Sequence, residues 1–178
     1  MEENFDHIVY SKDVLEFVTV AAEYCGYIET FEEDKTSDFL SRSQKILSLL
    51  YLKTMLLPEI EAIEEETEKF VTEFDWIRIS EKVASRLGEH DLFVEVPESA
   101  VLQPDDISSV SLSEIFADIY QDLKDFISLY QMGNHDTMND ALFFCKLNFE
   151  QYWGQRLLVT MTAIHNLLHG AEDIDNEE

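Results

Sequence analysis

Basic residues are scarce in this chain of 178 residues: 12 Lys and Arg stand against 38 Asp and Glu, giving a formal net charge of −26. Such an excess of carboxylates repels phosphate backbones and anionic lipids, which argues against direct binding to nucleic acid or to a membrane surface. Cations, basic peptides and the basic faces of other proteins are the partners that this charge would attract. A solvated acidic surface is the simpler interpretation of the charge taken alone.

Cysteines and long apolar runs are also few. Cys25 and Cys145 lie far apart on apolar helix faces, so free, buried thiols in a reducing cytosol explain them best. The longest apolar segment, residues 46–57, is interrupted by Lys53 and is shorter than the roughly 20 residues that cross a bilayer. The first ten residues have no basic run before an apolar core, unlike a secretory signal. We therefore expect a cytoplasmic protein.

The sequence contains no glycine-rich phosphate loop, no nucleophile elbow and no HExxH metal motif. These absences argue against an enzyme without excluding one, because catalytic carboxylates need no local signature. No cofactor and no metal are expected.

Hydrophobic residues make up 46% of the chain, enough for a folded core despite the charge. The length fits one domain, which we place at residues 1–170, followed by an acidic flexible tail at 171–178. Apolar residues recur at helical spacing in five segments: 11–30, 36–57, 72–88, 111–132 and 137–169. Residues 59–68 fit either a short surface helix or an acidic connector. The pattern predicts an all-α, single-domain bundle of five or six helices, the last two forming a long antiparallel hairpin.

Two details refine this prediction. Thr72 with Asp75 and Ser111 with Glu114 have the spacing of capping boxes. Gly154 could bend or split the last helix. Between the third and fourth helices, residues 89–110 predict a long loop with one short extended segment and no partner strand.

Charged and polar residues inside the apolar arc of the last helix are the main candidates for a site. They are Asn139, Lys146, Glu150, Arg156 and Thr160. Buried charges must be paired: Lys146 and Glu150 lie four residues apart, and Glu23 or Asp122 could pair with Arg156. A core salt-bridge network is favoured over an internal anion pocket centred on Arg156. Trp153 is expected in the core.

Asp118, Asp122 and Asp125 fall beside the apolar arc of the fourth helix, which predicts a solvated acidic stripe more strongly than a cation site. His165 and His169 share one face of the last helix. Two imidazoles are too few to hold a metal without further ligands. A partly buried, hydrogen-bonded His165 and an exposed His169 are therefore the favoured interpretation.

Three stretches carry a family resemblance: LLYLKTMLLP at 49–58, ADIYQDLKDFISLYQMG at 117–133 and MNDALFFCKLNFEQYWGQRLL at 138–158, followed by Ala163, Ile164 and His165. The chain resembles an uncharacterised family of bacterial proteins, the domain of unknown function 5063. That resemblance implies a small helical fold in a bacterial cytoplasm, and it transfers no catalytic residue. The stretch at 138–158 also includes Gly154 and Gln155.

Three functions are compatible with the sequence. The leading hypothesis is a non-enzymatic interaction module whose acidic surface binds a basic protein partner. The alternative is a protein that binds a small molecule or metal, and that could be an enzyme. Its pocket would be lined by Arg156, Glu150, Lys146, Trp153, His165, Asp118 and Asp122. The third is a mimic of nucleic acid, in which carboxylates imitate phosphates.

Overall fold

The structure is a computed structural model that describes residues 7–32, 35–95, 108–170 and 174–175. A short 3-10 turn, η1 (Ile8–Tyr10), precedes the first helix. The chain then forms α1 (Lys12–Thr30), α2 (Thr36–Met55), α3 (Glu73–Leu87), the turn η2 (Gly88–Asp91), strands β1 (Leu92–Glu95) and β2 (Ser108–Ser111), α4 (Leu112–Tyr130), α5 (His135–Asn148), a π-turn η5 (Phe149–Trp153) and α6 (Gly154–His169).

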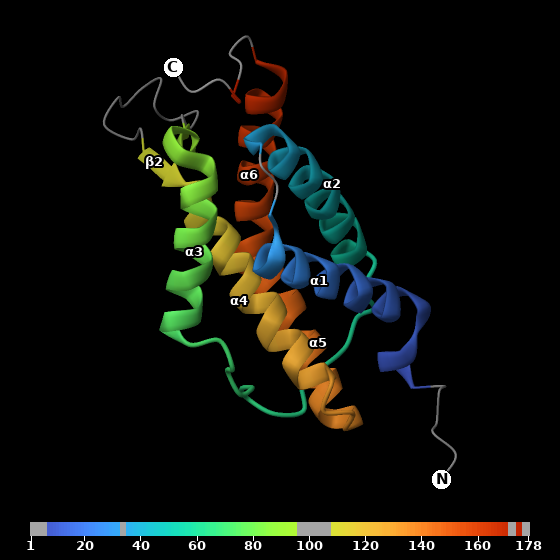
Figure 1. Cartoon of the computed structure of the whole chain (residues 1–178). Coiled ribbons are helices and arrows are strands. Elements are labelled where there is room, and N and C mark those ends of the chain that lie inside the picture. Colours follow the sequence, from blue (N-terminus) through green and yellow to red (C-terminus); the bar gives the residue numbers. More distant parts are fainter. Residues whose placement is uncertain (1–6, 33–34, 96–107, 171–173, 176–178) are drawn as a thin grey trace.

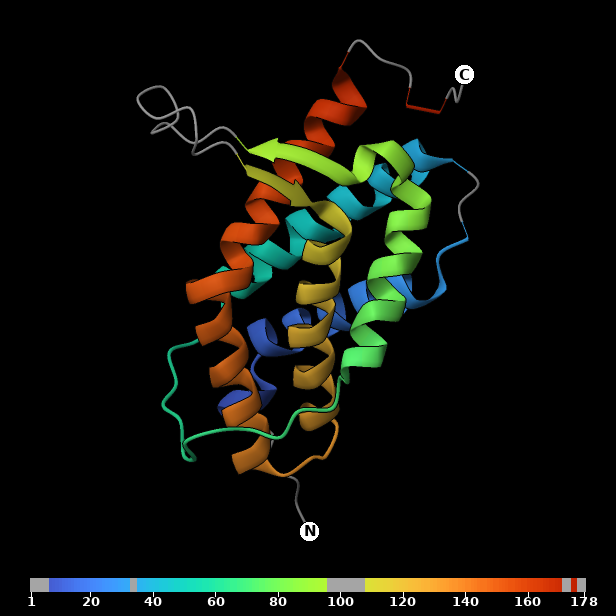
Figure 2. The same cartoon turned by 90° about the vertical axis from the view of Figure 1, so that its left-hand side faces the viewer.

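The fold is the expected all-α bundle. α5, η5 and α6 follow one another as a single long rod, which runs antiparallel to α4 as the second arm of a hairpin (Figures 1 and 2). α3 packs on another side of α4, while α1 crosses it and α2 lies against α6. α4 is therefore the central helix, with neighbours on several sides.

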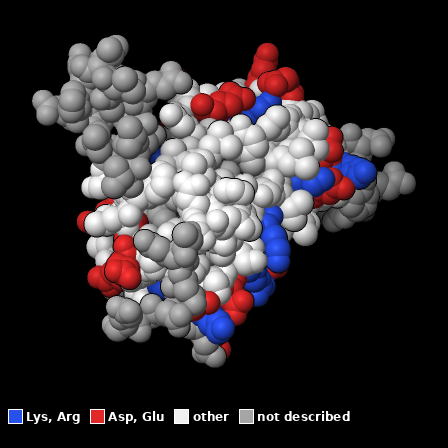
Figure 3. All heavy atoms as spheres, turned by 90° about the horizontal axis from the view of Figure 1, so that it is seen from above, with Lys and Arg blue, Asp and Glu red and all other residues white. Residues whose placement is uncertain are grey.

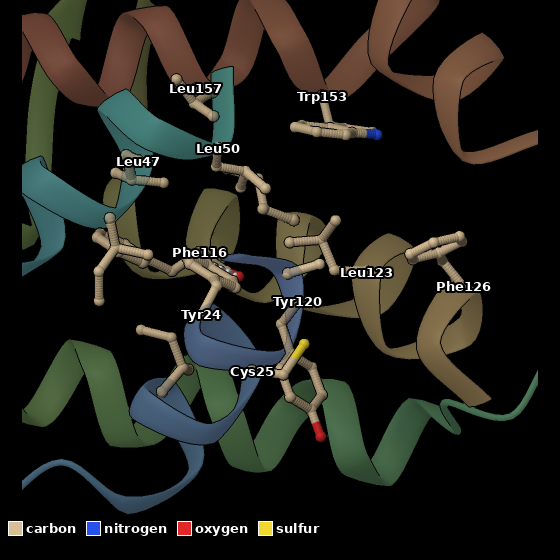
Figure 4. Close-up of a cluster of buried hydrophobic side chains, with 14 of the residues drawn as sticks. Tyr24, Cys25, Leu47, Leu50, Phe116, Tyr120, Leu123, Phe126, Trp153 and Leu157 are labelled. Carbon is tan, nitrogen blue, oxygen red and sulfur yellow. Dashed lines mark hydrogen bonds between the residues drawn. The ribbon is translucent and has the colours of Figure 1, made fainter. Parts of the chain in front are cut away.

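The core forms where α1, α2, α4 and the last rod meet (Figure 4). Trp153 is fully buried, and its indole Nε1 donates to the backbone oxygen of Cys145 at 3.3 Å. The Tyr24 hydroxyl donates to the backbone oxygen of Phe116 at 2.9 Å, which joins α1 to α4. Such buried aromatics bring large apolar area into the core while their polar atoms stay hydrogen-bonded.

Local signals fix the helix boundaries. The Thr72 side chain accepts from the Asp75 amide while the Asp75 carboxylate accepts from the Thr72 amide, so the predicted capping box starts α3. Ser111 Oγ accepts from the Glu114 amide at 3.3 Å. α5 begins at His135, two residues before the predicted start, because Asn134 caps it. Gly133 has a φ of 74°, which suits it to the turn between α4 and α5.

The prediction of a single unpaired extended segment was wrong. β1 pairs antiparallel with β2, with Phe93 opposite Val110 and Leu92 opposite Ser111. β2 reads Ser-Ser-Val-Ser, so it has only one apolar residue and no alternating pattern to reveal it. Asp91 joins the start of β1 to the end of β2, because its carboxylate accepts from the Ser111 hydroxyl and the Ser113 amide.

Within the described residues, no helix has both the length and the apolar character needed to span a membrane. Of the predicted acidic tail, residues 171–173 and 176–178 lie outside the described part. Asp175 accepts hydrogen bonds from the amide and hydroxyl of Ser37, at the start of α2.

Candidate functional site

The segment between α2 and α3, residues 56–72, is an acidic connector and not a short helix. It runs around one end of the bundle, passing α5 and α4 on its way to α3 (Figures 1 and 2). Six of the ten residues from 59 to 68 are glutamates, and all six side chains are exposed. The connector therefore carries a dense row of carboxylates on a backbone without regular secondary structure.

Two buried aspartates hold this backbone in place. Asp140 on α5 accepts from the amides of Ile63 and Glu64, at 2.8 and 3.0 Å. Asp125 on α4 accepts from the amides of Phe70 and Val71, at 2.7 and 2.8 Å. Each aspartate is only 3% exposed. Hydrogen bonds to a carboxylate are among the stronger ones in proteins, so the middle and the C-terminal end of the connector are firmly attached.

Two further side chains from α5 complete the attachment. The Asn139 amide donates to the backbone oxygen of Glu61 at 2.8 Å. Lys146 lies 2.6 Å from the Glu59 carboxylate, and not beside Glu150 as predicted. The Lys146 side chain is 14% exposed whereas that of Glu59 is 95% exposed, so the lysine reaches outward from the bundle. Both Asn139 and Lys146, predicted to be buried, serve to position the connector.

The solvated stripe predicted on α4 was wrong. Asp118 accepts from Trp76 Nε1 at 2.9 Å and from the Tyr152 hydroxyl at 2.7 Å, so it links α3 to the π-turn. Asp122 accepts from the Asn148 side chain at 2.7 Å. Burial raises the pKa of Asp122, and the Asn148 hydrogen bond opposes part of that rise. These carboxylates face neighbouring helices because α3 and α5 flank α4 on both sides.

The predicted network of buried charges around Arg156 was also wrong. Glu150 is exposed, and Arg156 is half-buried with its guanidinium 5.2 Å from the centroid of the Tyr152 ring. The two expected carboxylate partners are engaged elsewhere: Glu23 with Arg42 and Asp122 with Asn148. Buried Trp153 and buried Thr160 are where the sequence placed them.

His165 is exposed rather than partly buried, and His169 is exposed as expected. The π-turn explains these errors on the last rod. The Gly154 amide donates to the backbone oxygen of Phe149, five residues earlier, so the helix winds more slowly there. A projection at a constant 100° per residue therefore becomes inaccurate beyond residue 149, where it misplaced Glu150 and His165 although it placed Trp153 and Thr160 correctly.

Two hollows lie among the described residues. A cavity of about 10 Å³ lies beside Asp122, Asp125, Lys69 and Asn148, which is the size of one water molecule. A hollow of about 300 Å³ lies open at the surface near Phe31, Lys82, Ser85 and Arg86. Neither cavity is lined by Arg156, Glu150 or His165. The structure thus brings Asp118 and Arg156 together at Tyr152, and it leaves Glu150 and His165 on the outside.

Sequence reasoning missed the role of Asp140 and Asp125. One signal was available. The irregular connector has backbone amides that no regular secondary structure satisfies, so buried polar side chains on nearby helices are candidates to accept from them. Asn139 was recognised as buried, but its acceptor lies 78 residues away and no local pattern identifies it.

These features define a helical bundle with an acidic connector tied to its core. The chain belongs to the family described as Domain of unknown function (DUF5063), which it matches over residues 8–170. It is similar to protein BF1032 from Bacteroides fragilis, known from a crystal structure, with 41% sequence identity and a TM-score of 0.82. The alignment covers 93% of this chain and 98% of that one. No curated protein matches it significantly.

Proposed function

We propose that this protein is a non-enzymatic interaction module that binds a basic segment of another protein along the acidic connector. The observation that carries the proposal is the attachment of the connector backbone by Asp125, Asp140 and Asn139, which leaves its glutamate side chains directed to solvent. A backbone fixed in advance loses little conformational entropy when a partner binds.

The composition of the connector specifies the partner chemistry. Its exposed carboxylates favour lysine and arginine side chains. Apolar side chains are exposed on the same stretch, with Ile63 at 57% and Phe70 at 38%, and Phe74 follows in the first turn of α3 at 74%. A partner segment that alternates basic and apolar residues would match both kinds of contact. The buried free thiols of Cys25 and Cys145 fit a reducing cytoplasm.

The experiment compares two variants with the same net charge. In the first, Glu64, Glu65 and Glu66 of the connector are replaced by glutamine. In the second, exposed Glu81, Glu89 and Glu114, which lie outside the connector, are replaced in the same way. Each protein is used at low salt to capture partners from a lysate of its host, and the recovered proteins are identified by mass spectrometry.

We expect the wild type and the second variant to recover the same basic protein, the first variant to recover much less, and added salt to weaken all three captures. If both variants recovered equally less of the partner, binding would depend only on the total charge of the protein, and the connector would not be the binding surface. Recovery of background proteins alone by the wild type would reject the interaction function itself.

A further inference from the structure

His165 and His169 form a pair of exposed imidazoles on α6. They lie four residues apart on one face of the helix, and their ring centroids are 4.7 Å apart with the planes tilted by 53°. Neither ring is held by a described hydrogen bond to another residue. Their nitrogens are therefore available to a ligand from solvent.

The spacing matches what one metal ion requires. With zinc–nitrogen bonds of about 2.0–2.1 Å, two imidazoles on one tetrahedral zinc ion place their ring centroids about 5 Å apart in non-parallel planes. His7 and His135 form a second pair with centroids 4.6 Å apart, but their planes are inclined by only 21° and the rings are stacked. Nitrogens of stacked rings point in parallel directions and do not converge on one ion. Of these two described pairs, the α6 pair is the one with both the distance and the tilt.

The surroundings also distinguish α6 from the rest of the protein. It is the one α-helix of the described chain without an acidic residue, and Arg156 is its only lysine or arginine. α2 lies beside it, with the Ser48 hydroxyl 3.7 Å from the sulfur of Met161, and α2 has Asp38 as its only acid. Viewed from the end where α6 finishes and α2 begins, a broad area of the surface lacks charged residues (Figure 3).

Two ligands leave a tetrahedral ion incomplete. No group of three or more His, Cys, Asp or Glu able to hold a metal occurs among the described residues. Large aliphatic side chains are also exposed elsewhere on α2 and α6: Leu49, Leu52, Met55 and Leu158. A second copy would meet strong charge repulsion at most surfaces of a chain with net charge −26, and less of it at α6, which has no acidic residue.

We propose that His165 and His169 form half of a zinc site, and that a second copy, related by a two-fold axis, supplies the other two imidazoles. A two-fold axis brings the same residues from both chains to one point, so four imidazoles complete the tetrahedral preference of zinc. This site is independent of the acidic connector, which lies on other elements.

The test uses the full chain without a polyhistidine tag. Light scattering with size-exclusion chromatography measures the mass in excess EDTA and in zinc, and titration calorimetry measures the stoichiometry. Cobalt(II) provides a spectroscopic check, because tetrahedral cobalt has intense visible bands whereas six-coordinate cobalt has weak ones. The variants are His165→Ala and His169→Ala, with His135→Ala from the stacked pair as the matched control.

We expect a monomer in EDTA, a dimer with one zinc ion per two chains, and a tetrahedral cobalt spectrum. Each α6 variant should lose at least about 100-fold in zinc affinity, because losing a ligand costs more than losing a supporting partner, while His135→Ala behaves as wild type. Tight binding of one zinc ion per monomer would overturn the shared site. So would a dimer that persists in EDTA, zinc binding that survives both α6 variants, or failure of zinc to bind at all.

Discussion

Replacing Asp140 with alanine tests whether the connector is held by the bundle. The wild-type carboxylate uses both of its oxygens on the connector, one for the Ile63 amide and one for the Glu64 amide. A hydrogen bond to a charged group contributes roughly 1.5–3 kcal/mol. Both amides can bind water once the connector detaches, so the lower value applies, and the two bonds together give about 3 kcal/mol.

A change of that size alters an equilibrium by about two orders of magnitude. Because the connector can open without unfolding the helices, the effect should appear as local opening. We expect the amides of Ile63 and Glu64 to exchange with deuterium about 100-fold faster in Asp140→Ala, as measured by NMR at constant pH, while the amides of α4 keep their protection.

Glu150→Ala, at an exposed position on the same rod, is the matched control and should change neither set of amides. If the Ile63 and Glu64 amides exchange equally fast in wild type and Asp140→Ala, then these hydrogen bonds do not hold the connector. The preorganisation argument behind the proposed function would then fail.

Two further predictions concern stability. Gly154→Ala should destabilise the protein, because the new Cβ would lie 2.6 Å from the Phe149 backbone oxygen. Gly26→Ala in α1 has open space around it and should stabilise the protein by roughly 0.5–1 kcal/mol. Thermal melts in which both variants shift the melting temperature in the same direction would contradict this. Asp122→Asn keeps an acceptor for Asn148 and removes an acid whose pKa is raised by burial. Ionisation of Asp122 lowers the stability of the wild type as pH rises above the ordinary aspartate pKa of 3.8, so urea unfolding should show the variant gaining stability relative to wild type as pH is raised from that value. A difference that stays constant with pH would be inconsistent with this.

The helices with strong local signals were predictable from the sequence. α3 has a capping box at Thr72 and Asp75 and a glycine at its end, and the structure confirms both boundaries. The apolar arc of α4 is buried as expected, because residues such as Ile115, Ile119 and Leu123 recur at helical spacing. Local propensity and burial agree in these segments.

The errors arose where contacts with distant parts of the chain decide whether a residue is buried or paired. Asp118, Asp122 and Asp125 fall outside the apolar arc of α4, yet α3, the connector and the last rod cover them. No periodicity reveals that a helix is covered on several sides. β2 was missed because its partner strand, and not its own sequence, defines it. The anchoring role of Asp140 likewise depends on a contact 77 residues away.

The wide turn at Phe149–Trp153 has a consequence for comparing relatives of this chain. A π-turn holds one residue more than the α-helix requires, so it acts as a one-residue insertion absorbed without breaking the rod. In a homologue that lacks the extra residue, a gapless alignment would pair each position beyond the turn with one that points about 100° away, the step of one helical residue. Residues paired with His165 and His169 in that way would lie on another face of the helix. Alignments within the family should therefore place their gaps at this turn before surface residues of the final helix are equated.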